Sequence, residues 1–174
     1  PNINEILLNS FKNENIAVSD SQLAQFIRYY ELLLEWNEKI NLTAITEPAD
    51  VAVKHFADSL LALKMLPDDN WQNKKMIDIG TGAGFPAIPL KIMKQSLDVI
   101  LFDSLQKRLN FLDTVCQELA LANIRTVHGR AEDSGQDKTM REQYDIACAR
   151  AVAKMPVLLE YTLPFVKVGG YFIA

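Results

Sequence analysis

The stretch from residue 76 to residue 90, MIDIGTGAGFPAIPL, restricts the possible folds more than any other part of the chain. A short apolar run contains an acid and leads into three glycines that stand two residues apart. In α/β proteins, a glycine-rich turn between a buried strand and a helix lets the backbone approach a bound nucleotide. The stretch therefore predicts a strand, a ligand-binding turn and a helix.

The rest of the chain divides around this motif. After residue 75, short apolar stretches alternate with helical ones, which is typical of a parallel sheet built from crossover units. PFVKVGGYFIA at the end predicts a helix, a turn at Gly169 and Gly170, and a last strand. Earlier in the chain, a helix follows a cap at Ser19 or Asp20, and Pro48 opens another helix. The predicted parts are a helical cap (1–66), a polar linker (67–75) and a core (76–174).

Net charge and cysteine content limit the possible partners, metal sites and cellular compartment of the protein. The net charge of the 174 residues is -4, whereas nucleic-acid binders are more often basic. All of the negative excess lies before residue 76, which leaves room for a basic patch in the core. Cys116 and Cys148 form no C-x-x-C pair, and the histidines stand alone, so we expect no metal site and a reducing cytoplasm. No apolar stretch is long enough to span a membrane, and we expect no signal peptide.

The glycine turn departs from the dinucleotide fingerprint. G-x-G-x-x-G would place its third glycine where Phe85 stands, whereas this turn reads G-x-G-x-G through Gly80, Gly82 and Gly84. A glycine-rich turn without a ligand is the alternative. Asp78 beside the turn would repel a pyrophosphate but could attract an ammonium or orient a water. The turn therefore favours S-adenosylmethionine over NAD.

A second acid supports a nucleoside ligand. Asp103 ends the next strand, LDVILFD, and an acid at that place accepts hydrogen bonds from ribose hydroxyls. A helix cap is the competing role for Asp103, and the two roles are compatible. We therefore expect the cofactor to lie across the ends of these two strands.

The fourth strand, YDIACARAVAKMP, bears on the methyl acceptor. It lacks the Asp/Asn-Pro-Pro-aromatic sequence that is typical of amine methylation. Cys148 follows Ala147 and not the proline of carbon-5 methylation, so we expect a buried small side chain. Arg150 stands at the strand end and suits an acceptor with a free lone pair, such as nitrogen 7 of guanine, which needs no general base. It could pair with O6 of guanine or hold a carboxylate, or form a salt bridge with Asp145 or Glu132.

Six motifs occur in one order: WNEKINLTAIT, KHFADSL, IDIGTGAGFPAIPL, FDSLQKRLNFL, GRAED and ARAVAKMP. From about residue 30 to residue 174 the chain resembles the bacterial RsmG (GidB) methyltransferases. The resemblance implies an α/β, Rossmann-like class I methyltransferase with a mostly parallel sheet and an N-terminal helical extension. It also implies methylation of nitrogen 7 of one guanine, nucleotide 527 of 16S rRNA, in the small ribosomal subunit. Members of this family continue with two more strands, so we expect those last strands to be missing here.

The resemblance also assigns residues. It implies that Gly80 and Phe85 lie in the cofactor turn, Asp103 and Ser104 at the second strand, Ala131 and Glu132 near the adenine, and Arg150 at the cofactor or acceptor edge. Glu132 could instead cap the next helix. Six cations could contact phosphates or merely be solvated: Lys91, Lys94, Lys107, Arg108, Arg125 and Arg130.

The HFADSL motif and the kind of activity leave alternatives open. His55 and Asp58 share a helical face, and they either have a structural role or pack the cap against the site. The competing functions are a non-catalytic S-adenosylmethionine-binding or assembly protein and a small-molecule methyltransferase.

Overall fold

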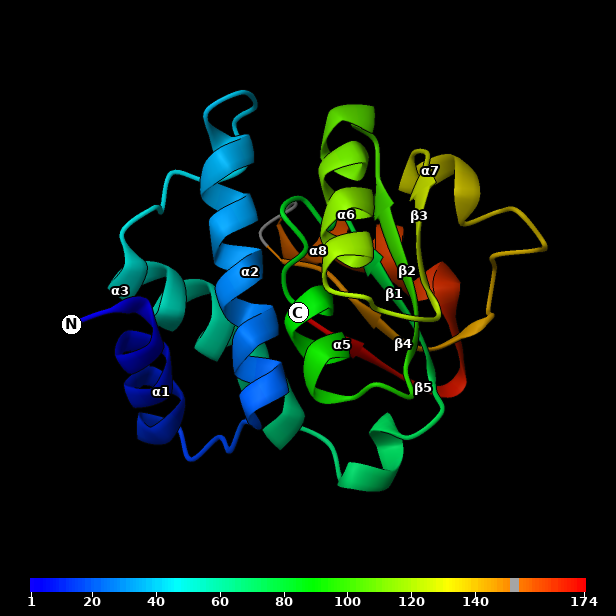
Figure 1. Ribbon diagram of the computed structural model, residues 1–174. Coiled ribbons are helices and arrows are strands. Elements are labelled where there is room, and N and C mark those ends of the chain that lie inside the picture. The colour runs from blue at the N-terminus through cyan, green and yellow to red at the C-terminus, as the bar shows by residue number, and fades with distance from the viewer. Residues whose placement is uncertain (151–153) are drawn as a thin grey trace.

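A parallel five-stranded sheet forms the centre of the computed structural model, which describes residues 1–150 and 154–174. Its strands are β1 (Lys75–Ile79), β2 (Asp98–Asp103), β3 (Ile124–His128), β4 (Tyr144–Cys148) and β5 (Val166–Ile173). Their order is β3-β2-β1-β4-β5 (Figure 1). The order reverses between β1 and β4, and ligands bind at such a point beyond the carboxyl ends of the strands.

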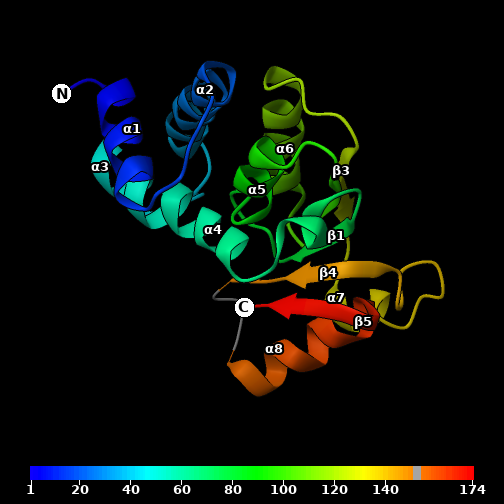
Figure 2. The same cartoon turned by 90° about the horizontal axis from the view of Figure 1, so that it is seen from below.

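Helices cover both faces of the sheet because parallel strands are apolar on both sides. The covering elements are α5 (Ala87–Met93), α6 (Gln106–Glu118), α7 (Ala131–Ser134), α8 (Met155–Thr162) and the 3-10 turn η4 (Leu163–Phe165). Figure 2 shows α5 and α6 on one face, and α8 on the other. Within the described residues, the sheet therefore has the predicted Rossmann-like arrangement.

The first part of the chain is helical, as predicted. Its elements are α1 (Ile3–Asn13), α2 (Asp20–Asn37), α3 (Pro48–Asp50), the π-helix η1 (Val51–Ala57), α4 (Asp58–Leu60) and the 3-10 turn η2 (Leu61–Lys64). Ser19 caps α2 and forms a capping box with Gln22, so the Ser19 alternative is confirmed. Pro48 occupies the first turn of α3, also as predicted.

The cap and the sheet share one hydrophobic core. Helix α2 packs on α5 and α6, and a chain of aromatic rings runs from α1 to the glycine turn. The ring centroids of Phe11 and Phe26 are 5.0 Å apart, those of Phe26 and Phe56 are 5.2 Å apart, and those of Tyr29 and Phe85 are 5.5 Å apart. Burial of these large side chains stabilises both parts together.

One local prediction differs from the structure, and the segment predicted as a linker contains a short turn. Residues 67–75 hold the 3-10 turn η3 (Asp68–Trp71), where Trp71 is fully buried because its indole joins the shared core. The glycines at 169 and 170 lie inside β5 and not in a turn before it. They accompany a register shift against β4, and a Cβ at Gly170 would lie 2.7 Å from the Asp145 carbonyl oxygen. The division into cap, linker and core stays a prediction.

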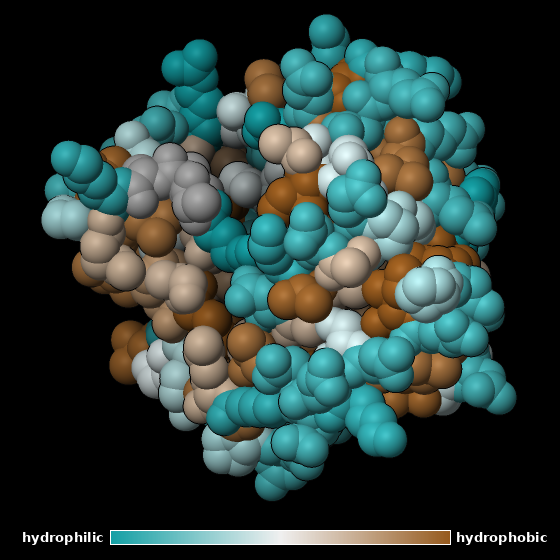
Figure 3. Space-filling model, turned by 90° about the vertical axis from the view of Figure 1, so that its left-hand side faces the viewer, coloured by the Kyte–Doolittle hydropathy of each residue, from teal (hydrophilic) through white to brown (hydrophobic). Residues whose placement is uncertain are grey.

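The outer surface on the side of the N-terminal helices is mixed. Figure 3 shows polar side chains over much of this face, with apolar patches between them on both sides. Val53 and Met65, which are 54% and 61% exposed, are two of the large apolar side chains on the outside of the molecule.

The two inner glycines of the turn should differ in their tolerance of a side chain. Both have positive φ, +59° at Gly82 and +99° at Gly84. A Cβ at Gly84 would lie 2.6 Å from the Tyr29 hydroxyl, whereas a Cβ at Gly82 meets nothing closer than 3.9 Å. We expect Gly84→Ala to lower the free energy of unfolding by about 1–3 kcal/mol more than Gly82→Ala does, because the added methyl group would overpack the space beneath Tyr29. Urea unfolding of both variants measures the difference, and equal losses would contradict this packing.

Candidate active site

A cavity of about 330 Å³ opens at the carboxyl ends of β1, β2 and β3. That volume lies within the range of small-molecule sites. Five of the predicted cofactor residues line it: Gly80, Asp103, Ser104, Ala131 and Glu132. The structure thus brings together residues from three separate motifs, although contact with a cofactor stays a prediction.

Asp103 organises the floor of this cavity. Its Oδ2 accepts a hydrogen bond from Gly82 N at 2.9 Å, and its Oδ1 accepts one from Leu105 N at 3.0 Å. Arg108 lies 3.6 Å away as an ion-pair partner. An ionised carboxylate has about four lone-pair positions, so these two backbone bonds leave capacity for ribose hydroxyls. Asp103 therefore joins the glycine turn to the start of α6, and α6 has no side-chain cap.

Asp78 lies behind the turn and does not line the cavity. Its Oδ2 accepts hydrogen bonds from Thr81 Oγ1 at 2.9 Å and from Ala87 N at 3.3 Å, which ties the turn to α5. The other oxygen, Oδ1, has no hydrogen-bond partner among the described residues. Burial raises the pKa of Asp78 to about 7, against the partial effect of these hydrogen bonds.

Phe85 and Gly84 face the helical cap. The Phe85 ring stacks on His55 with centroids 4.4 Å apart and an interplanar angle of 9°. Tyr29 donates a 2.5 Å hydrogen bond to the Ala83 carbonyl oxygen beside them. Burial, reinforced by the charge of Arg150, lowers the pKa of His55 to about 4. His55 is therefore neutral at pH 7 and packs the cap against the turn, which is one of its two predicted roles.

Arg150 lies beyond β4 and contacts the cap. Its guanidinium lies 3.0 Å from Asp58 Oδ2 and donates to Ser59 Oγ at 3.1 Å and to the Lys54 carbonyl oxygen at 3.3 Å. The alternative of a salt bridge with Asp145 or Glu132 is wrong, because Asp145 instead pairs with Lys167 at 3.4 Å and Glu132 lies at the first cavity.

Arg150 lines a second cavity with Asp58, and Gly82, Gly84, Phe85 and Asp78 line neither cavity. Cys148 is buried as predicted, and burial raises the pKa of its thiol. Both cysteines are free.

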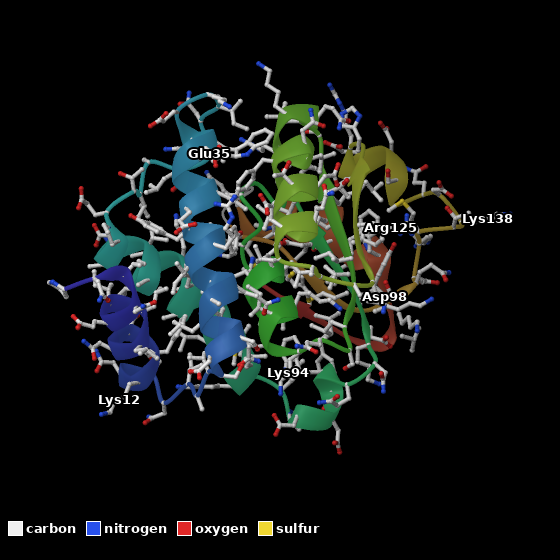
Figure 4. All side chains as sticks on the ribbon, in the orientation of Figure 1. Lys12, Glu35, Lys94, Asp98, Arg125 and Lys138 are labelled. Carbon is white, nitrogen blue, oxygen red and sulfur yellow. The ribbon has the colours of Figure 1, made fainter. Side chains whose placement is uncertain are left out.

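The six predicted phosphate-contacting cations do not form one surface. Lys91 is 1% exposed, and its Nζ donates to the carbonyl oxygens of Gln95 and Leu97, so its assignment to a phosphate surface is wrong. Lys94 pairs with Asp68 at 3.6 Å. Figure 4 shows Lys94 near the lower edge of the molecule and Arg125 at the right, close to Asp98. Of the six, Arg130 lines the first cavity.

Some residues of the site had no signal in the sequence. Tyr161 of α8 lines the first cavity, and Ser59 holds Arg150 from more than 90 residues away. The HFADSL motif contains Ser59 and pointed to this region of the cap, but it did not predict the contact between Ser59 and Arg150. A search of residues 1–150 and 154–174 found no group of side chains that could hold a metal ion. In the same ranges, no helix is both long and apolar enough to cross a bilayer.

The sheet order, the glycine turn after β1 and the acid ending β2 define a Rossmann-like class I methyltransferase. Within this class the chain belongs to the GidB family, rRNA small subunit methyltransferase G, whose model matches residues 22–174. The family resemblance of the motifs is therefore confirmed.

Individual proteins agree with this assignment. Ribosomal RNA small subunit methyltransferase G of Alkaliphilus oremlandii is 53% identical over 173 residues, covering 98% of this chain and 71% of that protein. The protein of the same name from Streptococcus pneumoniae strain ATCC 700669 is 51% identical over 172 residues, with coverages of 98% and 71%. The chain thus spans about 70% of the length of such relatives.

Solved structures support the fold alone. A Plasmodium falciparum protein described as a protein-L-isoaspartate O-methyltransferase, in complex with S-adenosyl-L-homocysteine, has a TM-score of 0.60 at 16% identity. The match covers 99% of this chain and 83% of that one. A SAM-dependent methyltransferase from Aquifex aeolicus has a TM-score of 0.53 at 19% identity, with coverages of 72% and 65%.

The buried Asp78 should make stability depend on pH. Its folded-state pKa of about 7 exceeds its ordinary value of 3.8, so the folded protein holds a proton that the unfolded chain releases. Its contribution is fully present below the ordinary value and is lost as the pH rises through about 7. Relative to Asp78→Asn, we expect the natural protein to lose about 2 kcal/mol of unfolding free energy between about pH 5 and about pH 7. Urea unfolding at several pH values tests this, and parallel curves for the two proteins would contradict it.

Proposed function

We propose that the protein methylates nitrogen 7 of a guanine, nucleotide 527, in 16S rRNA of the small ribosomal subunit. S-Adenosylmethionine is the cofactor. The observation that carries the choice of acceptor is Arg150 at the end of β4, where a strand-end nucleophile or general base would otherwise stand. Cys148 is buried with a raised thiol pKa and is unsuited to attack a pyrimidine carbon. Nitrogen 7 of guanine carries a free lone pair and therefore needs neither an enzyme nucleophile nor a general base.

The first cavity has the groups that the adenosine part of the cofactor needs. Asp103 supplies acceptors for the ribose hydroxyls, and Ala131 and Glu132 supply backbone groups beside the adenine. Tyr161 and Leu105 give the same cavity apolar surface. These residues fit a nucleoside, and the tight turn at Gly80, with φ of +65°, lets the backbone come close to it.

The chemical step demands alignment more than acid–base help. When bound, the cofactor supplies an activated methyl group on a positively charged sulfur. The lone pair of guanine nitrogen 7 would form the new bond to that carbon, and the carbon–sulfur electron pair would return to sulfur. The positive charge would then lie on the purine, and no proton would need to be transferred. The chain's own residues hold donor and acceptor in line, which is how orientation lowers a barrier.

Asp103 provides a test of the cofactor site. We expect Asp103→Ala to weaken S-adenosyl-L-homocysteine binding by at least about tenfold, because a hydrogen bond to a charged group is worth about 1.5–3 kcal/mol and tenfold in affinity corresponds to about 1.4 kcal/mol. Asp98→Ala is the matched control, since Asp98 is exposed at the other end of the same strand. Titration calorimetry measures both affinities and should detect no NAD binding. Unchanged affinity in folded Asp103→Ala would remove Asp103 from the site.

Arg150 and Cys148 provide a test of the chemistry. We expect Arg150→Ala to slow methyl transfer by more than about tenfold, or roughly 1.4 kcal/mol of barrier. Cys148→Ala should keep most activity because no covalent enzyme intermediate forms. Single-turnover assays on small-subunit particles measure both. A dead Cys148→Ala beside a normal Arg150→Ala, with both folded, would favour a pyrimidine carbon as the acceptor.

Mapping of nitrogen-7 methylation in 16S rRNA, with and without the protein, separates the proposal from its rivals. A new methyl group at one guanine supports the proposed function. Cofactor binding with no methylated product would favour a non-catalytic or assembly role. Transfer only to small molecules would favour a small-molecule methyltransferase. Action in the cytoplasm, where ribosomal subunits are found, stays part of the proposal.

A further inference from the structure

The cavity beside Arg150 is separate from the proposed cofactor cavity. It has a volume of about 290 Å³ and lies where β4 and β5 end, against α4 and η2. Pro86 lines it, whereas Gly80 lines the first cavity, so the segment from Gly80 to Pro86 extends from one cavity to the other. Because β1 and β4 are neighbours, the two cavities flank the point where the strand order reverses. The second cavity therefore stands where an acceptor could meet the donor.

The walls of the second cavity combine apolar surface with one charge of each sign. Apolar surface comes from Leu61, Ala62, Met65, Pro86 and Ile173. The charged pair is Asp58 and Arg150. Enzymes that act on a nucleobase hold it between apolar side chains and read its Watson–Crick edge by hydrogen bonds. The cavity has both components.

The charged pair is held in place by the cap. Ser59 Oγ accepts from Arg150 at 3.1 Å and donates to the His55 carbonyl oxygen at 2.5 Å. The Arg150 guanidinium lies 3.0 Å from Asp58 Oδ2 and so offsets its charge. Half of the Asp58 side chain is still exposed to solvent, so its carboxylate can accept further hydrogen bonds.

We propose that this cavity receives the acceptor base and that Asp58 distinguishes guanine from adenine, an inference that rests on the proposed function. The Watson–Crick edge of guanine presents two adjacent donors, N1–H and the N2 amino group, which one carboxylate accepts together. Adenine presents a lone pair at N1, which the carboxylate repels. Nitrogen 7 lies on the opposite edge of the purine, so this grip leaves the methyl acceptor free.

The same carboxylate also suits the product. Methylation at nitrogen 7 makes the purine ring cationic, and the charge develops during transfer. A carboxylate oxygen beside the ring stabilises that charge where it forms. Because Arg150 at 3.0 Å offsets part of the Asp58 charge, we expect Asp58 to act mainly on the choice of base.

The test uses small-subunit particles in which the target guanine is replaced by inosine, which lacks the N2 amino group and keeps nitrogen 7. With the natural protein we expect kcat/KM to be at least about tenfold lower on inosine than on guanine. Inosine lacks the N2 amino group, so the Asp58 carboxylate loses one hydrogen-bond donor in the transition state. In Asp58→Ala the inosine penalty should shrink to less than about twofold, since the group that senses N2 is gone. Asp50→Ala is the matched control, because Asp50 is a half-buried acid on the same helical run and pairs with Lys54. It should keep the full penalty.

The outcomes separate the two levels of the proposal. If Asp58→Ala slows transfer equally on guanine and inosine, Asp58 only positions Arg150 and the assignment is overturned. Absence of an inosine penalty in the natural protein also overturns it. If the natural protein methylates no guanine at all, the proposed function itself fails.

A binding measurement tests the base site without turnover. In the presence of S-adenosyl-L-homocysteine, an NMR titration should show guanosine monophosphate binding more tightly than inosine monophosphate. Asp58→Ala should remove this difference while leaving S-adenosyl-L-homocysteine affinity unchanged. Equal binding of the two nucleotides to the natural protein would overturn the assignment of Asp58.

Discussion

The buried carboxylate of Asp78 fixes the geometry on which both cavities depend. It accepts hydrogen bonds from Thr81 inside the turn and from the first residue of α5, Ala87, so the turn cannot move independently of the helix. One of its oxygens lacks a partner among the described residues, and such a buried group is costly. Close packing of Gly84 under Tyr29 holds the turn from the other side. Strand end, turn and helix are therefore held together as one unit beside both cavities.

The helical cap contributes residues to the candidate active site as well as covering the sheet. His55 stacks on Phe85 of the turn, while Asp58 and Ser59, three and four residues further on, hold Arg150. The π-helix η1 contains His55 and leads directly into α4, and π-helical segments are frequent at functional sites. Packing of one short segment thus sets the turn and the strand-end arginine together.

Periodicity predicted the elements, and local chemistry predicted part of the site. Strand–helix alternation gave the parallel sheet, and Ser19 and Pro48 marked helix starts, because these signals depend on neighbouring residues alone. The partner of Arg150 was predicted wrongly, since Asp58 is distant in sequence and only tertiary packing brings the two together. The same limit applies to Lys91, because its charge predicted an exposed side chain. In the structure its Nζ instead donates hydrogen bonds to two backbone carbonyl oxygens inside the protein.

The proposed reaction gives a role to the acids that line the two cavities, beside Arg130 in the first and Arg150 in the second. In the proposed reaction, the methyl donor carries a positive charge before transfer and the methylated guanine carries it afterwards. Asp103 lies at the proposed donor cavity and Asp58 at the proposed acceptor cavity, so a carboxylate would stand near the cation at both stages. Phosphate contacts need the opposite charge and belong on surfaces away from the reacting atoms. A net charge of -4 is therefore compatible with an RNA substrate. The acids near the reacting atoms would stabilise the positive charge of the reaction, and they are not expected to contact the phosphates of the RNA.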